Sequence, residues 1–288
     1  MEIINRPQRM MSAMKKLRQE NKVLALIPTM GALHEGHMSL VKKARQMADI
    51  VVVSIFVNPT QFNEEADLEK YPRDLTADAA LLADFQVDFI YAPDSSDIYG
   101  EGFSTFVTVD EVSDKLEGAS RPGHFRGVAT IVTILLNTIR PDFAYFGQKD
   151  AQQVAVIKRL TEDLAIDTEI VVMPIVREDN GLARSSRNER LTKKQRNAAS
   201  IIYASLLKAQ NAVENGELNA SELTEMVRKN IESEPLAATD YIAVVDNETL
   251  EPIEKIGDSP VLVAVAVRFG EIRLIDNIIL EKKASSGI

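Results

Sequence analysis

The stretch Pro28-Thr29-Met30-Gly31-Ala32-Leu33-His34-Glu35-Gly36-His37-Met38-Ser39-Leu40 decides the fold. It follows an apolar run, residues 23–27, that is typical of a buried strand, and it leads into apolar residues at helical spacing. A strand, a glycine-containing turn and a helix form an anion site in α/β proteins, because the helix start offers unpaired N–H groups and a positive dipole end. The turn carries His34 and His37, two of the three histidines of the chain.

Three interpretations of His34 and His37 assign them different chemistry. A zinc pair is disfavoured, since His-Glu-Gly-His lacks the four-residue spacing that places two ligands on one helix face. Structural histidines, satisfied within the fold, are the second interpretation. The third, which the helix start favours, is donation of hydrogen bonds to phosphate oxygens whose charge grows during a reaction. The turn also lacks the glycine and lysine spacing of the loop that serves γ-phosphoryl transfer.

Strand-like and helix-like segments alternate on both sides of this motif. Strands are predicted at residues 23–27, 50–57, 88–93, 103–109, 143–146 and 169–176, and helices at 8–20, 75–85, 128–139 and 151–164. This alternation predicts an α/β fold with a Rossmann-like, doubly wound parallel sheet. Ligands bind such sheets at the carboxyl ends of the strands, so the residues that follow each strand are candidates for a site.

The pattern changes after about residue 177. Two long helical segments, 192–215 and 220–233, precede strand candidates at 240–245, 261–267 and 273–280. Helices followed by strands, without alternation, predict a smaller α+β C-terminal domain. We therefore expect two domains, 1–177 and 178–288, with a frayed end at 282–288.

Composition excludes several kinds of chemistry and partner. The 288 residues include no cysteine, which rules out disulfides, thiolate metal sites and a cysteine nucleophile. The formal net charge of −10 argues against nucleic-acid and anionic membrane partners. No apolar run approaches the roughly 20 residues that span a bilayer, and the N-terminus lacks the pattern of a secretory signal. We expect a cytoplasmic protein.

Basic residues nevertheless recur after the predicted strands. Arg121 begins the glycine-containing segment 121–127. This segment is either part of an anion site or simply a basic surface loop. After the strand at 143–146, Gly147 and Gln148 precede Lys149 and Asp150. In a Rossmann arrangement the glycine admits a ribose, the aspartate accepts from its hydroxyls and the lysine meets a phosphate. The alternative is a simple turn in which the aspartate caps the next helix.

Two further groups carry polar side chains suited to a ligand. Ser185, Ser186 and Arg187 offer two hydroxyls and a cation, on a loop that either closes over a triphosphate or merely links two domains. Gln61 and Gln153 are neutral donors and acceptors near two strand ends, and either can simply be a surface residue. Local clusters of this kind are what an acidic protein needs to bind a small anion.

Together these motifs resemble the pantothenate synthetase family, the pantoate–β-alanine ligases. The matching segments, in order, are Pro-Thr-Met-Gly-Ala-Leu-His-Glu-Gly-His (28–37), Phe-Val-Asn-Pro-Thr-Gln-Phe (56–62), Tyr-Pro-Arg (71–73), Arg-Pro-Gly-His-Phe-Arg-Gly (121–127), Phe-Gly-Gln-Lys-Asp-Ala-Gln-Gln (146–153) and Ser-Ser-Arg-Asn (185–188). A strand, motif and helix with paired histidines also resembles the nucleotidyl transferases, which cut ATP between its α- and β-phosphates.

The resemblance implies a two-step reaction in pantothenate and coenzyme A biosynthesis. The carboxylate of pantoate attacks the α-phosphate of MgATP, and the amine of β-alanine then attacks the pantoyl adenylate. No enzyme nucleophile is needed, so catalysis is positioning and charge stabilisation. The first domain would bind ATP and pantoate, and the second would close over the active site. The resemblance implies a homodimer that binds small molecules. ATP with Mg²⁺ would be a co-substrate, and no cofactor would be tightly bound.

The resemblance also assigns residues. ATP would contact Met30, Gly31, His34, Gly36, His37, Gly147, Gln148, Lys149, Asp150, Val176, Arg184, Ser185, Ser186 and Arg187. The catalytic set would be His34, His37, Lys149 and Arg187, with His37 the proton donor proposed for the family. Pantoate and β-alanine would contact Gln61, Gln153 and Arg121.

Two positions depart from the family pattern. Asp78 is the candidate for the Mg²⁺-associated acid, although it follows Thr76-Ala77 and not an acidic run. The acidic segment 64–69 is interpreted as a solvated face, because Mg²⁺ arrives with ATP and needs only one or two protein carboxylates. Arg184 replaces the apolar residue usual before Ser-Ser-Arg, which adds charge near the triphosphate.

Two other functions use the same motifs. One is a nucleotidyl transferase that leaves AMP on its product, as the pantetheine-phosphate adenylyltransferases do; the C-terminal domain and the Gln61 and Gln153 pair speak against it. The other is a non-catalytic nucleotide-binding module. Pantoate-dependent exchange of pyrophosphate into ATP, followed by AMP release on addition of β-alanine, separates all three.

Overall fold

The structure, a computed structural model, describes residues 1–282. The expectation of a frayed end at 282–288 lies, apart from residue 282 itself, outside the described residues. The chain divides into two compact units. Unit 1 comprises residues 1–148 and 152–174, and the described part of unit 2 comprises residues 149–151 and 175–282. The short segment 149–151 therefore groups with the C-terminal part of the chain, although unit 1 surrounds it in sequence.

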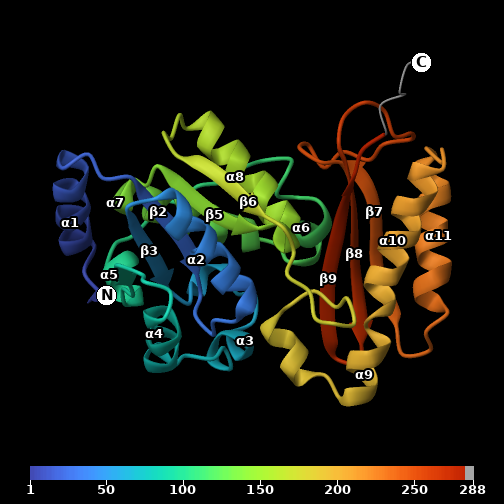
Figure 1. The fold of residues 1–288 in the computed structure, drawn as a ribbon, viewed down its shortest axis with the longest axis horizontal. Helices are drawn as coiled ribbons and strands as arrows, with labels where there is room; N and C mark the ends of the chain where they lie inside the picture. Colours follow the sequence, from blue (N-terminus) through green and yellow to red (C-terminus); the bar gives the residue numbers. More distant parts are fainter. Residues whose placement is uncertain (283–288) are drawn as a thin grey trace. The chain divides into compact units, whose positions relative to one another are not determined.

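Unit 1 is built on six parallel strands in the order β1-β4-β3-β2-β5-β6. The strands are β1 (Glu2–Ile4), β2 (Leu24–Thr29), β3 (Ile50–Ile55), β4 (Phe89–Tyr91), β5 (Phe143–Gly147) and β6 (Glu169–Met173). From β2 the chain winds outward through β3 and β4, and then continues on the other side of β2 with β5 (Figure 1). The ends of β2 and β5 thus flank the point where winding reverses, which is where α/β sheets bind ligands.

Helices cover both faces of this sheet, as expected for a doubly wound fold. The helices of the N-terminal part are α1 (Pro7–Gln19), α2 (Glu35–Met47), α3 (Glu65–Glu69), α4 (Leu75–Ala83), α5 (Ser95–Ile98), α6 (Leu116–Ser120), α7 (His124–Ile139) and α8 (Ala151–Asp163), with short 3₁₀ turns η1 (Pro59–Gln61) and η2 (Gln148–Asp150). Val41 of α2 and Leu82 of α4 pack against Ile27 and Val53 of the central strands. The predicted Rossmann-like sheet is confirmed.

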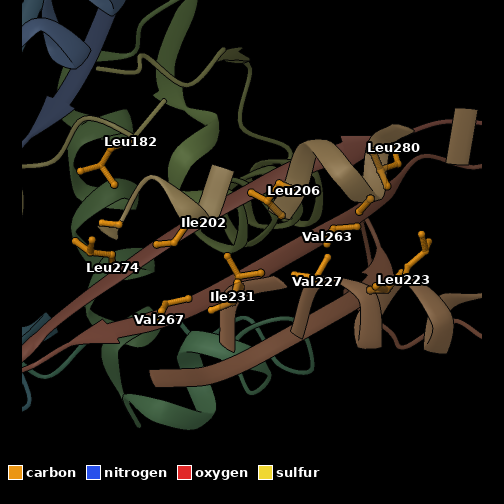
Figure 2. Close-up of a cluster of buried hydrophobic side chains, with 14 of the residues drawn as sticks. Leu182, Ile202, Leu206, Leu223, Val227, Ile231, Val263, Val267, Leu274 and Leu280 are labelled. Atoms are coloured by element: carbon orange, nitrogen blue, oxygen red, sulfur yellow. The ribbon is translucent and has the colours of Figure 1, made fainter. Parts of the chain in front are cut away.

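Unit 2 is a three-stranded antiparallel sheet covered by helices. Its elements are η3 (Ser186–Arg190), α9 (Lys193–Ala198), α10 (Ile201–Glu214), α11 (Ala220–Glu232), β7 (Ala238–Asp246), β8 (Val261–Phe269) and β9 (Ile272–Leu280). The strand order is β7-β8-β9. Leu206 of α10, Val227 of α11 and Val263 of β8 meet in its apolar core (Figure 2). This confirms the predicted α+β fold of the C-terminal part.

Three local predictions are wrong. Residues 103–109 form no strand, because their backbone finds other partners; the Val107 N–H donates to Thr130 Oγ1 at 3.0 Å. The helix predicted at 192–215 is two helices, since the Ser200 and Ile202 N–H groups bond three residues back and tighten the turn between α9 and α10. The strand predicted at 169–176 ends at Met173, because Pro174 has no N–H for the ladder.

Short elements were also missed. The edge strand β1, the helices α3, α5 and α6, and the first turn of α7 were not predicted from the sequence. Among residues 1–282, the structure has no helix that is both long enough and apolar enough to cross a membrane.

Candidate active site

The turn between β2 and α2 has a left-handed backbone at two successive residues. Gly31 has φ 81° and Ala32 has φ 50°. Glycine adopts this conformation freely, whereas alanine there is strained by about 1–2 kcal/mol. Thr29 Oγ1 accepts a hydrogen bond from Gly31 N at 3.2 Å and donates to Ser54 O at 2.7 Å, which ties the turn to β3.

A carboxylate distant in sequence holds the other side of this turn. Asp78, in the first turn of α4, is only 5% exposed. Its Oδ2 accepts a hydrogen bond from Ala32 N at 3.1 Å, and its Oδ1 accepts one from Leu33 N at 2.8 Å. Both oxygens of Asp78 therefore bind the backbone that leads into His34.

The two histidines cap the start of α2. His34 is the N-cap residue, and its Nδ1 accepts a hydrogen bond from Gly36 N at 3.1 Å. His37 Nδ1 accepts one from His34 N at 3.2 Å, and the two ring centroids are 4.1 Å apart. Because each Nδ1 is an acceptor, each neutral ring carries its proton on Nε2 and donates from there. The structural and the phosphate-donor interpretations are thus compatible, since they use different ring nitrogens.

At the end of β3, Asn58 and Gln61 are buried and bonded to each other. Asn58 is 1% exposed and its Nδ2 donates to Gln61 Oε1 at 3.0 Å and to Gly127 O at 3.1 Å. Tyr99 donates its hydroxyl hydrogen to Asn58 Oδ1 at 2.7 Å. Gln61 Nε2 lies 3.2 Å from the sulfur of Met30, in the turn after β2. The ends of β2 and β3, which the sequence indicated as two separate candidate sites, are therefore adjacent.

Sequence reasoning missed Asn58. It lies in the quoted segment 56–62, directly after a strand and before a proline, and this position was the available signal. A buried asparagine that orients a glutamine is recognisable only when the Gln61 and Gly127 contacts are seen.

Side chains of the segment 121–127 contact the backbone of the same glutamine. His124 Nδ1 donates to Gln61 O at 2.9 Å, and Arg121 Nη1 donates to His124 Nε2 at 3.2 Å. A cavity of about 130 Å³ lies here, with Gln61, His124 and Arg126 in its wall. Gly127 permits this approach, because a Cβ at that position would lie 2.5 Å from Thr60 O.

The adjacent glutamines of α8 differ in their surroundings. Gln152 is 5% exposed; its Nε2 donates to Val112 O at 2.9 Å and to Lys115 O at 2.7 Å, and its Oε1 accepts from Glu117 N at 2.8 Å. It holds the segment before α6. Gln153 is half-buried in the first turn of the helix.

In unit 2, a narrow cavity is bordered by several of the expected ATP contacts. Lys149, Ser185 and Arg187 line it together with Arg273 and Asp276. Ser185 caps η3, since its Oγ accepts from Arg187 N at 3.3 Å. Lys149 Nζ lies 3.5 Å from Asp150 Oδ1. Three cationic side chains, one hydroxyl and the acid Asp276 thus line one recess.

Strand β9 supports this recess from behind. Asn277 Nδ2 donates to Lys149 O at 3.0 Å. Asp276, which is 3% exposed, accepts from Arg177 Nη1 at 2.6 Å and from Arg177 Nη2 at 3.1 Å. Burial raises the pKa of Asp276, and the hydrogen bonds from Arg177 act in the opposite direction. The Arg177 guanidinium also stacks on Tyr203, 3.6 Å from the ring centroid.

The remaining candidates lie on a short hairpin of unit 2. Arg184 N donates to Val176 O at 2.9 Å, so these two residues face each other across it. Glu178, on the same hairpin, accepts from Arg196 Nε at 2.9 Å and from Asn188 Nδ2 at 2.8 Å. The Arg196 hydrogen bonds, followed by that of Asn188, lower the pKa of Glu178.

The expected site residues are thus divided into two groups according to the unit to which they belong. The group in unit 1 comprises Met30, Gly31, His34, Gly36, His37, Gln61, Asp78, Arg121, Gly147, Gln148 and Gln153. The group in unit 2 comprises Lys149, Asp150, Val176, Arg184, Ser185, Ser186 and Arg187. That both groups serve a single active site stays a prediction.

The fold and the turn after β2 define a class of α/β proteins that hold an anionic ligand at a helix start beside a strand-order reversal. Within that class, the chain belongs to the pantoate-beta-alanine ligase family, whose family model matches residues 2–279. This confirms the resemblance seen in the sequence motifs.

Relatives match this chain over nearly its whole length. It is 49% identical to the pantothenate synthetase of Thermosipho africanus over 280 residues, which cover 97% of this chain and 100% of the relative. It is 49% identical to that of Heliobacterium modesticaldum over 263 residues, covering 91% and 93%.

Solved structures agree with this assignment. The pantothenate synthetase of Thermus thermophilus superposes with a TM-score of 0.89 at 40% identity, covering 96% of this chain and 99% of that one. The pantoate-beta-alanine ligase of Francisella tularensis, complexed with beta-gamma ATP and beta-alanine, gives a TM-score of 0.78 at 37% identity and full coverage of both chains.

Proposed function

We propose that this chain is an ATP-dependent ligase that condenses (R)-pantoate with β-alanine to pantothenate, through a pantoyl-adenylate intermediate. One carboxylate oxygen of pantoate attacks the α-phosphorus of ATP, and the bond from that phosphorus to the bridging oxygen breaks, so that pyrophosphate leaves with the electron pair. The β-alanine nitrogen then attacks the acyl carbon, loses a proton and expels AMP.

The observation that carries this proposal is the capping of α2 by two imidazoles. His34 and His37 accept backbone hydrogen bonds at Nδ1, which leaves Nε2–H as the donor of each ring. A pair of such donors at a helix start suits phosphate oxygens that gain charge as pyrophosphate leaves. The reaction needs no base for an enzyme nucleophile, and this geometry offers none at Nδ1.

The buried amides at the end of β3 support pantoate binding. Asn58 fixes Gln61 Oε1, and the Gln61 backbone is fixed by His124. Gln61 Nε2 also meets Met30 in the turn that carries the histidines. A glutamine held in this way can orient a hydroxy acid, since its position is determined before the substrate arrives. We assign Gln61, Gln153 and Arg121 to pantoate and β-alanine.

The recess of unit 2 supports binding of the triphosphate. Lys149 and Arg187 line the recess and supply cations, and Ser185 supplies a hydroxyl there. Ser186, in the 3₁₀ turn that Ser185 caps, supplies a second hydroxyl. Arg184 adds a further positive charge in this loop. The proposal assigns this group, with Val176 and Asp150, to ATP, and expects the C-terminal domain to close over the nucleotide.

Magnesium enters this proposal as part of MgATP. Within residues 1–282, no three His, Asp or Glu side chains gather into a group that could hold a metal ion. The surroundings of Asp78 do not fit a direct magnesium ligand, because both of its oxygens accept backbone N–H groups. No step of the proposed reaction therefore involves an ion that the protein itself binds.

We further propose a cytoplasmic homodimer. Residues 103–109 belong to no helix or strand and include Phe106, which is 38% exposed and stacks with Arg126 at 3.8 Å. A second copy of this chain would cover this surface. Sedimentation of the wild type and of Phe106→Asp tests the proposal: a dimer that the substitution dissociates supports it, and a monomeric wild type contradicts it.

The activity itself is tested by isotope exchange. Labelled pyrophosphate should enter ATP only when pantoate is present, and addition of β-alanine should then release AMP. Exchange without pantoate would favour a different adenylating enzyme. A folded protein that binds ATP but shows no exchange would favour a non-catalytic nucleotide-binding module.

A further inference from the structure

We propose that Asp78 is a positioning residue that fixes the turn at residues 31–33, and through it the two capping histidines, and that it does not bind Mg²⁺ directly. The inference rests on the proposed function, because adenylation is its main readout. It departs from the assignment that the family resemblance implied for this carboxylate.

The geometry of the carboxylate is the first argument. Asp78 Oδ2 and Oδ1 accept hydrogen bonds from Ala32 N and Leu33 N, at 3.1 and 2.8 Å. The side chain comes from α4, 45 positions beyond Leu33, and is 5% exposed. Hydrogen bonds between backbone N–H groups and a carboxylate are roughly twice as strong as neutral ones. A buried contact of this kind determines the path of the turn.

The conformation of the turn is the second argument. Gly31 and Ala32 are both left-handed, with φ 81° and 50°. Successive N–H groups in such a turn point into one concave side, which attracts an anion. Here the carboxylate of Asp78 occupies that side, and its bonds offset the strain at Ala32. Since Leu33 is followed directly by the N-cap His34, the direction in which α2 starts depends on this contact.

The space around the carboxylate is the third argument. A Cβ added at Gly31 would lie 2.8 Å from Asp78 Oδ2 and 3.2 Å from Ile55 Cγ2. Mg²⁺ requires near-octahedral oxygen coordination and keeps several of its waters. The positive ends of two N–H groups already face these oxygens, and the contact with the glycine backbone leaves little room for a hydrated ion.

The experiment compares Asp78→Asn with Asp84→Asn, a matched change of the exposed acid that ends the same helix. In Asp78→Asn the amide oxygen accepts one N–H, but the NH₂ group faces the other. We expect pantoate-dependent pyrophosphate exchange to fall ~10²-fold, as for a displaced catalytic group. The Mg²⁺ concentration that gives half-maximal exchange should remain that of the wild type, and Asp84→Asn should match the wild type in both measurements.

A higher Mg²⁺ requirement in Asp78→Asn, with exchange restored by excess Mg²⁺, would overturn the inference, and so would normal exchange. If Asp84→Asn and the wild type show no pantoate-dependent exchange, the proposed function itself fails. If the wild type and Asp84→Asn exchange normally but Asp78→Asn does not behave as stated, only this inference fails and the proposed function stands.

Two measurements keep the test valid if Asp78→Asn does not fold. Gly31→Ala keeps the carboxylate but crowds it, and should lower exchange with an unchanged Mg²⁺ requirement. In the wild type, the amides of Ala32 and Leu33 should exchange with solvent slowly, at a rate that Mg²⁺ added with ATP does not raise. Faster exchange on Mg²⁺ addition would mean that the carboxylate leaves the turn for the ion, which would overturn the inference.

Discussion

In unit 1 three buried polar side chains bind backbone groups of loops, whereas in unit 2 two largely buried acids bind arginine side chains. Asn58, Asp78 and Gln152 each hold a backbone segment that is distant in sequence. Asp276 and Glu178 instead accept hydrogen bonds from arginine side chains. A side chain that fixes a loop fixes what the loop presents to a ligand. We therefore expect substitutions of Asn58, Asp78 or Gln152 to impair chemistry, and substitutions of Asp276 or Glu178 to reduce mainly stability.

The largest expected effect is on the apolar core of unit 2. Leu206 is fully buried among residues of α11 and β8 (Figure 2). Leu206→Ala should lower the free energy of unfolding by about 2–5 kcal/mol, because it removes buried methyl groups and leaves a cavity. Denaturant titration measures this loss. Ile279→Ala, at a residue 37% exposed, is the control and should cost far less. Equal losses would show that this core does not stabilise the unit.

The second prediction compares one phosphate contact from each unit. His37→Ala and Lys149→Ala should each lower turnover by ~10²-fold or more, as loss of a preorganised electrostatic donor does. Initial rates of pantothenate formation measure this, and thermal unfolding checks that each variant folds. Lys158→Ala, an exposed lysine of α8, is the control for lost charge. Near-normal rates in both variants would contradict the phosphate assignment in both units.

The third prediction concerns the residue that sequence reasoning missed. Asn58→Ala removes the Asn58 amide that donates to Gln61 Oε1, and a buried group left without its partner costs about 1–3 kcal/mol. The Tyr99 hydroxyl loses one of its two partners and keeps Thr60 Oγ1. We expect the KM for pantoate to rise ~10-fold, which corresponds to about 1.4 kcal/mol, because Gln61 is no longer held. Asn137→Ala, at an exposed residue whose amide donates only to Thr133 O within α7, is the control. An unchanged KM for pantoate would show that pantoate binding does not depend on Asn58 holding Gln61 in place.

The sequence predicted the elements whose pattern is local. The runs at residues 23–27 and 50–57 are apolar except for Ser54, because both faces of β2 and β3 are covered. The edge strand β1 has three residues, too few for a pattern. Residues 103–109 alternate like a strand, yet their backbone bonds to a side chain of α7. Alternation reports which side chains are buried and does not report whether a neighbouring strand exists.

The candidate site was predictable as a set of motifs but not as a set of contacts. Glycine, histidine and lysine after strands indicated where ligands bind. The roles of Asn58 and Asp78 depend on partners 69 and 46 positions away, and no local spacing encodes such pairs. The same limit applies to Asp276 and Asn277, which are distant in sequence from the Lys149 recess that they support.

The smallest predicted effect tests the ion pairs of unit 2 by their pH dependence. Glu178, whose side chain is 11% exposed, has a lowered pKa chiefly because Arg196 donates hydrogen bonds to it. A carboxyl with a lower pKa in the folded state adds stability above its unfolded value near 4.5, and this stability is lost as pH falls through the folded pKa. Glu178→Gln should therefore lower the free energy of unfolding by about 1 kcal/mol at pH 7.

The difference between wild type and Glu178→Gln should shrink as the pH falls from about 4.5 through the lower pKa that Glu178 has in the folded protein, because the carboxyl is protonated and uncharged below that pKa. Asp276 has the opposite dependence, because burial raises its pKa and its ionisation costs folded-state stability as pH rises. That contribution is present in both proteins and cancels in their difference. Denaturant titrations from pH 7 to pH 3 therefore isolate Glu178. A difference that stays constant over this range would mean that Glu178 acts through its shape and neutral hydrogen bonds. The charged pairs of unit 2 would then not stabilise the unit, contrary to the comparison between the two units.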